Sequence, residues 1–122
     1  MGDLTKDFSV YEFKCPCCGE SRMDLDTVKR LQTLRDLYGK RIDIVEGGGY
    51  RCAKYDENLG AHYSGRAVDP GVPREDLYAV MKLAFEVGFT GIGVKQKKGR
   101  WQLHLDDAPA TAARPRPWIW TY

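Results

Sequence analysis

Apolar residues recur at helical spacing in the first third of the chain. Between residues 24 and 38 they lie three or four positions apart, at Leu25, Val28, Leu31, Leu34, Leu37 and Tyr38. Gly39 follows directly, and glycine is the usual residue just after a helix. The spacing therefore predicts an amphipathic helix over 24–38 that buries one of its faces.

A second segment, between residues 73 and 88, has the same spacing. Pro73 is compatible with the first turn of a helix, and Gly88 with its end. The apolar positions predicted to form the buried face are Leu77, Val80, Met81, Ala84 and Phe85. A shorter helical turn is expected at SVYE, where Ser9 and Glu12 have the spacing of a capping box.

Four other segments have the pattern of strands. IDIV (42–45) predicts a short buried strand that ends at the glycines of 47–49, and RAVDP (66–70) predicts a brief strand. GIGVKQ (91–96) and RWQLHLD (100–106) predict a β-hairpin around KKG. Alternation along the second strand of this hairpin separates its side chains into two sets. Trp101, Leu103 and Leu105 fall on one face, and Gln102, His104 and Asp106 on the other.

These elements predict a single α+β domain over residues 1–122, in which two helices pack on a small, mainly antiparallel sheet. The irregular stretch 47–65 is long for a small domain, and such loops are usually functional. Residues 108–122 are expected to form an extended tail that packs back on the domain. The reason is that Trp118, Trp120 and Tyr122 would be costly to expose.

Composition excludes several classes of protein. The formal net charge of +2 and the sequence pI of about 8.3 are too mild to indicate nucleic-acid binding. No segment approaches the roughly 20 apolar residues of a membrane span, so no membrane insertion is expected. The first residues lack the features of a signal peptide. We therefore expect synthesis in the cytoplasm without a leader. We also expect the protein to be a monomer.

The chain has two histidines, His62 and His104, and this scarcity limits any transition-metal site. A catalytic zinc ion takes three protein ligands and keeps a fourth position for water. His62, Asp69 and His104 would supply such a set, because Gly65 permits a reversal that returns Asp69 toward His62. Taken alone, the pattern is also compatible with a turn aspartate before Pro70 and an ordinary strand histidine.

Several segments resemble one known family. HYSGRAVD (62–69) resembles the H-x-x-G-x-A-x-D motif of the zinc D-Ala-D-Ala peptidases. This superfamily, peptidase family M15, includes DD-carboxypeptidases, phage L-alanyl-D-glutamate endolysins and the hedgehog signalling domain. GGGYRC upstream of the motif, and GFTGIGV followed by WQLHLD downstream, resemble further family segments in the same order. FKCPCCGE resembles the opening of the small, phage-associated branch, so the resemblance runs from about Phe8 to Asp106.

The resemblance implies a hedgehog/DD-peptidase-like fold and a Zn²⁺ cofactor held by His62, Asp69 and His104. It places Arg51 beside the substrate, where a guanidinium can bind a carboxylate or stabilise an oxyanion. Gln102, on the same strand face as His104, is a further candidate for substrate binding. Gly60 departs from the family, in which many members have serine two residues before the first histidine.

The implied function is zinc-dependent hydrolysis of peptidoglycan stem or cross-link peptides, at a bond that involves a D-amino acid. An endolysin that reaches the cell wall after holin-type release or phage delivery fits this reading. The alternative is a catalytically inactive zinc-scaffold module that binds cell-wall peptides or a protein partner.

Many members carry the general base, an acid, three residues before the last histidine, and this chain has Trp101 there. Asp106 is the candidate replacement, because it shares the strand face of His104. It could instead be a group behind the metal ligand or a strand-end cap. Glu46 is a further candidate, whereas Asp107 would face the opposite way.

The four cysteines, Cys15, Cys17, Cys18 and Cys52, leave three interpretations open. Cys15 and Cys18 form a C-x-x-C pair that could hold a structural zinc ion together with Cys52. A cysteine of the cluster could alternatively form a disulfide with Cys52 in an oxidising environment. The third interpretation is a set of buried free thiols.

Overall fold

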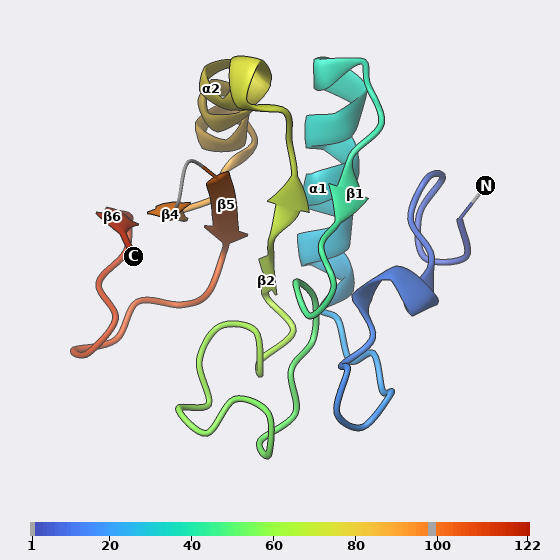
Figure 1. The fold of residues 1–122 in the computed structure, drawn as a ribbon, viewed down its shortest axis with the longest axis vertical. Helices are drawn as coiled ribbons and strands as arrows, with labels where there is room; N and C mark the ends of the chain where they lie inside the picture. Colours follow the sequence, from blue (N-terminus) through green and yellow to red (C-terminus); the bar gives the residue numbers. More distant parts are fainter. Residues whose placement is uncertain (1, 98–99) are drawn as a thin grey trace.

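Two helices lie on one face of a four-stranded sheet, and a two-stranded ribbon lies beside them (Figure 1). The computed structural model describes residues 2–97 and 100–122. The predicted α+β class is confirmed, with strand order β1-β3 in the ribbon and β2-β5-β4-β6 in the larger sheet. In chain order the elements are η1 (Val10–Phe13), α1 (Leu25–Tyr38), β1 (Asp43–Ile44), β2 (Ala67–Val68), β3 (Pro70–Gly71), η2 (Arg74–Asp76), α2 (Leu77–Val87), β4 (Gly91–Lys97), β5 (Arg100–Asp106) and β6 (Trp118–Thr121).

The helix predicted over 24–38 is confirmed as α1. Its N-cap is Asp24, whose Oδ1 accepts a hydrogen bond from the backbone N–H of Thr27 at 3.1 Å. This bond satisfies one of the donors that a helix leaves unpaired in its first turn. The helix ends where Gly39 takes a left-handed conformation and donates its N–H to the carbonyl of Arg35.

The second predicted helix is also present, as the 3-10 turn η2 followed by α2. One residue of its expected buried face was assigned wrongly: Phe85 is 55% exposed. Val80 and Ala84 are buried, and Val87 packs against the same core. The helix therefore packs on the core along the line through Val80, Ala84 and Val87, and Phe85 lies to one side of this line.

The predicted strands are found, with shorter bounds in the first half of the chain. Only two residues of IDIV pair, as β1, and neither of them is buried. RAVDP is divided at Asp69 into β2, which joins the larger sheet, and β3, which pairs with β1. The hairpin of β4 and β5 has Gly93 opposite His104. Lys98 and Gly99 of its predicted turn lie outside the described residues.

The tail returns to the sheet and adds an edge strand. β6 runs parallel to β4, with Gly93 opposite Trp120. This parallel pair makes an otherwise antiparallel sheet mixed. The tail is only partly covered, because Trp118 and Tyr122 stay 55% and 48% exposed.

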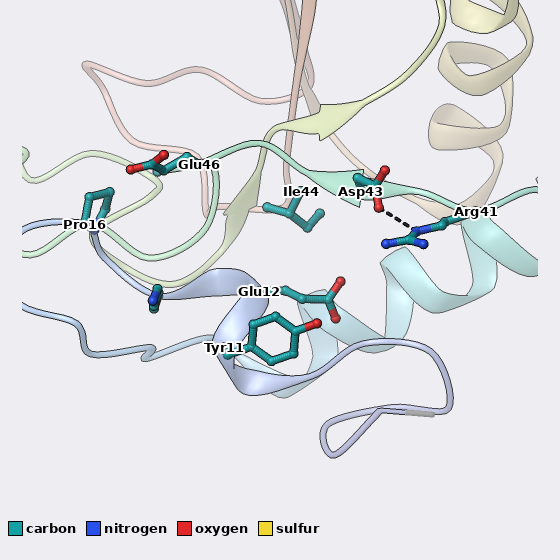
Figure 2. Close-up of a pocket in the computed structure, with 9 residues that line it drawn as sticks. Tyr11, Glu12, Pro16, Arg41, Asp43, Ile44 and Glu46 are labelled. Atoms are coloured by element: carbon teal, nitrogen blue, oxygen red, sulfur yellow. Dashed lines mark hydrogen bonds and ion pairs between the residues drawn. The ribbon is translucent and has the colours of Figure 1, made fainter.

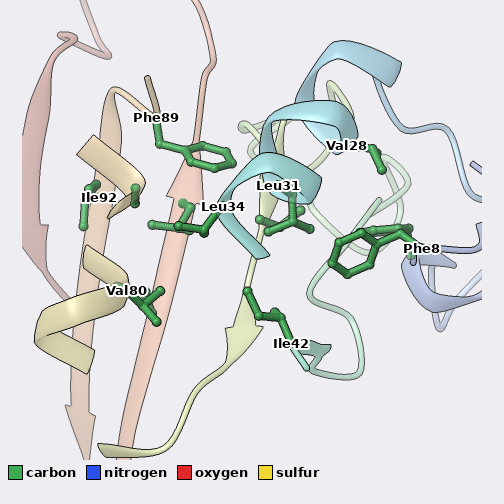
Figure 3. Packing of buried hydrophobic residues seen from close by; sticks show 13 residues of the cluster. Phe8, Val28, Leu31, Leu34, Ile42, Val80, Phe89 and Ile92 are labelled. Atoms are coloured by element: carbon green, nitrogen blue, oxygen red, sulfur yellow. The ribbon is translucent and has the colours of Figure 1, made fainter. Parts of the chain in front are cut away.

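The core lies between the helices and the sheet (Figure 3). Leu31 and Leu34 of α1 and Val80 of α2 meet Leu103 and Leu105 of β5 there. Since side chains alternate along a strand, the residues between these leucines point to the other face of the sheet. That second face carries His104. In the described part of the chain, no helix is both long and apolar enough to cross a membrane.

Helix α1 offers a matched test of this packing. Leu34 is fully buried, whereas Leu37, one turn later on the same helix, is 57% exposed. Leu34→Ala should lower the free energy of unfolding by about 2–5 kcal/mol, because it leaves a cavity in the core. Leu37→Ala should change it by no more than about 0.5 kcal/mol. Urea unfolding of the two variants measures both values, and equal destabilisation would contradict the arrangement.

Candidate metal centre

Strand pairing brings Asp69 next to His104. In the antiparallel register of β2 and β5, Val68 lies opposite Leu105, so the next residue, Asp69, faces His104. The backbone N–H of Asp69 donates to the carbonyl of Gly48 at 2.8 Å. The carboxylate is therefore held at the point where the chain passes from the four-stranded sheet to the ribbon.

The 47–65 loop supplies the other histidine. The backbone N–H of Arg51 donates to the carbonyl of His62 at 3.3 Å, which closes the loop on itself. Nδ1 of His62 lies 2.8 Å from the carbonyl oxygen of Gly49. Because a carbonyl only accepts, Nδ1 carries the proton, and Nε2 faces Asp69 with its lone pair.

The three predicted ligands converge. Oδ1 of Asp69 lies 3.3 Å from Nε2 of His62 and 3.3 Å from Nδ1 of His104. The three ligand atoms all lie within 4.8 Å of one another. The side chains of His62, Asp69 and His104 are 7%, 2% and 11% exposed. The sequence-based set is thus assembled in one place, although it comes from three separate segments.

The chemistry of this donor set fits a cation. Nε2 of His104 lies 2.7 Å from Oδ2 of Asp106 and donates a hydrogen bond to this carboxylate, so the neutral ring also presents the lone pair of Nδ1 to Asp69. Oδ1 of Asp69 is buried, and among the described residues none donates a hydrogen bond to it. Three acceptors that face one another repel unless a positive charge lies between them. Two imidazoles and a carboxylate suit Zn²⁺, at ligand distances of about 2.0–2.2 Å.

The pKa shifts have the signs that this geometry requires. Burial raises the pKa of Asp69, but the imidazoles of His104 and His62 lower it further, so the net pKa lies well below its ordinary range. Burial lowers the pKa of His104, yet the Asp106 and Asp69 carboxylates raise it above its ordinary value. In the metal-free protein, protons therefore compete with a metal ion for His104.

The second oxygen of Asp69 is held by two donors. Nη2 of Arg51 lies 3.0 Å from Oδ2, and Nε of the same side chain donates to the carbonyl of Gly47 at 2.7 Å. Nε2 of Gln102 donates to Oδ2 at 3.4 Å. These contacts fix the carboxylate so that Oδ1 alone faces the histidines. They also place Arg51 and Gln102, the two predicted substrate contacts, beside the metal set.

A cavity of about 340 Å³ opens beside the three ligands. Its lining comes from the 47–65 loop, from Asp69, from strands β4, β5 and β6, and from the residue after β6. The lining residues are Arg51, His62, Asp69, Lys95, Gln102, His104, Trp120 and Tyr122. Sequence analysis missed Lys95, Trp120 and Tyr122 as members of the site. The one available signal was the aromatic end of the tail, which was expected to pack back without a defined place.

A glycine on β4 makes room for the tail at this site. His104, Gly93 and Trp120 lie in one row across β5, β4 and β6. A Cβ atom at Gly93 would lie 2.8 Å from the ring of Trp120. Without a side chain at this position, the indole can cross the strand and pack 5.2 Å from the imidazole of His104, measured between ring centroids.

Asp106 lies behind the metal set. Its side chain is fully buried, and it accepts hydrogen bonds from Nε and Nη2 of Arg116 at 2.8 and 2.7 Å. Burial raises the pKa of Asp106, but His104 and Arg116 lower it well below its ordinary range. Both oxygens are occupied, and the side chain is not part of the cavity lining. The geometry favours the alternative role of a group that orients His104 over that of a general base.

The remaining candidates for the base lie elsewhere. Glu46 lines a separate cavity of about 590 Å³ between η1 and β1, as Figure 2 shows. Asp107 accepts hydrogen bonds from Thr27 and from Arg30 on the far side of β5. Trp101 is stacked under the guanidinium of Arg74, at 5.8 Å from the ring centroid. None of these side chains is among those that line the metal cavity.

A buried His–Asp–His set with one side open to a cavity is the form that catalytic zinc sites take. Residues 6–106 match the family model described as Peptidase M15. The chain belongs to the peptidase M15 family, whose members are zinc-dependent metallopeptidases. The family predicted from the sequence resemblance is thereby confirmed. No curated protein matches the sequence.

Asp106, the last residue of β5, and Asp107, the residue after it, provide a matched test of the ligand geometry. Asp106→Asn should lower zinc affinity about 10–100-fold, because the charge behind His104 is lost. Asp107→Asn removes a buried carboxylate that does not touch a ligand, and should leave zinc affinity unchanged even if stability falls. Competition with a chromophoric chelator measures both affinities. Equal affinities in the two variants would contradict the assigned role of Asp106.

Proposed function

We propose that the protein is a zinc peptidase that hydrolyses peptidoglycan stem or cross-link peptides at a bond involving a D-amino acid. The observation that carries the proposal is the convergence of His62, Asp69 and His104 at a cavity, in a chain of the M15 family. A zinc ion held there would polarise the scissile carbonyl and lower the pKa of a water molecule to about 7.

The cationic side chains at the cavity suit such a substrate. Stem peptides carry free carboxylates, and Arg51 and Lys95 both line the cavity. A guanidinium held by Gly47 and Asp69 has little freedom left, so it can receive a substrate carboxylate or a developing oxyanion without reorganising. Gln102 extends from the same strand face as His104 and can pair with a peptide group.

Tyr122 and Lys95 are the proton-bearing groups beside the ligands. Burial raises the pKa of Tyr122 to about 12, with the charge of Asp69 acting in the same direction and that of Arg51 opposing it. The ammonium of Lys95 lies 5.5 Å from the centroid of the Tyr122 ring. Tyr122 therefore keeps its proton at neutral pH and is placed to donate it to a leaving amine, with Lys95 beside it.

A specific observation also favours a second candidate, a zinc-scaffold module that binds cell-wall peptides without cutting them. Among the described residues, Asp69 is the one acidic side chain that lines the cavity, and it belongs to the set that would hold the metal. A free carboxylate to accept the proton of water would distinguish the peptidase from such a module. Turnover therefore decides between the two candidates.

The place of action forms part of the proposal. We propose that the protein acts on the cell wall as a monomer, after holin-type release or phage delivery, in the manner of an endolysin. The sequence opening FKCPCCGE, similar to that of phage-associated M15 members, supports this assignment.

Digestion of purified peptidoglycan tests the proposed activity. The zinc-loaded protein should release peptide fragments whose masses identify the cleaved bond. His62→Ala and chelator-treated protein should release none. Intact peptidoglycan that sediments with the protein, with no fragments released, would reject the peptidase and favour the binding module. Neither cleavage nor binding would reject both.

Arg51 can be tested separately from the metal. Arg51→Ala should lower kcat/KM on a soluble peptide that contains the identified bond about 10²-fold or more, because a fixed cation is removed from the reacting carbonyl or the substrate carboxylate. Arg41→Ala is the matched control, since Arg41 pairs with exposed Asp43 away from the metal cavity. Steady-state kinetics on both variants, at equal zinc content, gives the comparison. An unchanged rate in Arg51→Ala would reject its role.

A further inference from the structure

Three cysteine thiols form a second cluster of metal-binding groups. The sulfur atoms of Cys15, Cys18 and Cys52 all lie within 4.8 Å of one another. Cys15 is fully buried, Cys52 is half-buried, and Cys18 is exposed. The cluster joins two distant segments, the turn after η1 and the 47–65 loop. It shares no residue with the His–Asp–His set.

The CPCCG turn is shaped to bring two sulfurs together. The backbone N–H of Gly19 donates to the carbonyl of Cys15 at 2.8 Å, and Gly19 has a φ of 76°. The N–H of Cys15 donates in turn to the carbonyl of Glu20 at 2.7 Å. These two bonds fold the C-x-x-C pair into a tight loop, which is the spacing found in structural zinc sites.

Backbone amides point at the sulfur atoms. The N–H of Cys52 donates to Sγ of Cys15 at 3.4 Å, and the N–H of Glu20 donates to Sγ of Cys18 at 3.4 Å. Backbone N–H groups that point at a sulfur stabilise its thiolate form, which is the form that binds a metal. Thiolates stabilised in this way are the ligands that zinc prefers.

We propose that Cys15, Cys18 and Cys52 hold a structural zinc ion that fastens the N-terminal turn to the 47–65 loop. On the exposed side of the cluster, where Cys18 lies, a water molecule would complete the coordination. A disulfide would use two of the three clustered sulfurs and leave the third beside it. Zinc uses all three together.

The position of the cluster gives this ion a role in the metal cavity. Cys52 directly follows Arg51, the side chain that fixes Asp69. One residue earlier, the N–H of Tyr50 donates to the carbonyl of Phe13 at 2.9 Å. The ion would therefore reinforce a backbone connection between η1 and the loop, and keep Arg51 in place.

Metal content and cobalt spectra of the full-length protein test the proposal. Wild-type protein, prepared under reducing conditions, should bind two zinc ions per chain. After exchange with Co²⁺ it should show thiolate-to-cobalt charge-transfer absorption, which a His–Asp–His site cannot produce. His62→Ala should keep one ion and this absorption. Cys15→Ser should keep one ion and lose the charge-transfer absorption.

Cys18→Ser is the second ligand variant, because Cys18 is exposed and its replacement leaves the core packing intact. It should also lose the absorption. Cys17→Ser is the matched control, since it removes an exposed thiol outside the cluster, and it should keep both ions.

Three results would overturn the proposal. The first is a wild-type protein that binds one ion and shows no charge-transfer absorption. The second is thiols that react with a thiol reagent equally fast with and without a chelator. The third is a mass that reveals a disulfide after purification under reducing conditions. Failure of the peptidase assay alone would leave these readouts unaffected, because the two metal sites share no residue.

Discussion

The pairing of β2 with β5 is the constraint on which the metal centre depends. In this register Asp69 faces His104, and a shift of one residue would turn one of the two side chains to the opposite face of the sheet. Asp69 is also the residue at which the chain leaves the four-stranded sheet for the ribbon with β1. Hydrogen bonds from both sides hold its backbone, through the carbonyl of Gly48 and the N–H of Val45. The carboxylate is thus fixed before any metal binds, while the 47–65 loop brings His62 to it.

The C-terminal tail contacts the metal centre on the side of His104 and Asp106. Arg116 reaches the carboxylate of Asp106, and Trp120 packs against His104. Both contacts cross β4 at glycines, since a side chain at Gly91 would collide with the Arg116–Asp106 pair and one at Gly93 with Trp120. Because Gly91 and Gly93 have no side chains, the tail can cross β4 and reach the residues that orient a metal ligand. The edge strand β6 and the metal set therefore depend on each other.

The sequence predicted the parts of this structure that are locally encoded. Spacing of apolar residues identified both helices, and alternation along β5 separated Leu103 and Leu105 from His104. The ligand set was accessible because two histidines leave few choices and the family motif gives their order. The parallel pairing of β6 was not predictable, because it joins segments that share no local pattern. For the same reason Arg116 was missed as the partner of Asp106, and the sequence left the role of Asp106 open between a general base, a group behind the metal ligand and a strand-end cap. Phe85 was misplaced because a stripe of five apolar positions does not reveal which edge of it faces the core.

The charges around the cavity bear on which peptides the proposed peptidase would receive. In the metal-free protein, the carboxylate of Asp69 is balanced by Arg51 and that of Asp106 by Arg116. A metal ion held by the inner nitrogens of the two imidazoles would bind them in their neutral form, with the outer nitrogens donating to Gly49 and Asp106. A divalent cation added to this balanced set would leave an excess of positive charge at the ligands, and Lys95 adds to it from the cavity wall. Such a field favours an anion at the open position. A peptide that ends in, or carries, a carboxylate meets this requirement without further cations, whereas a neutral peptide would leave the excess charge unmatched.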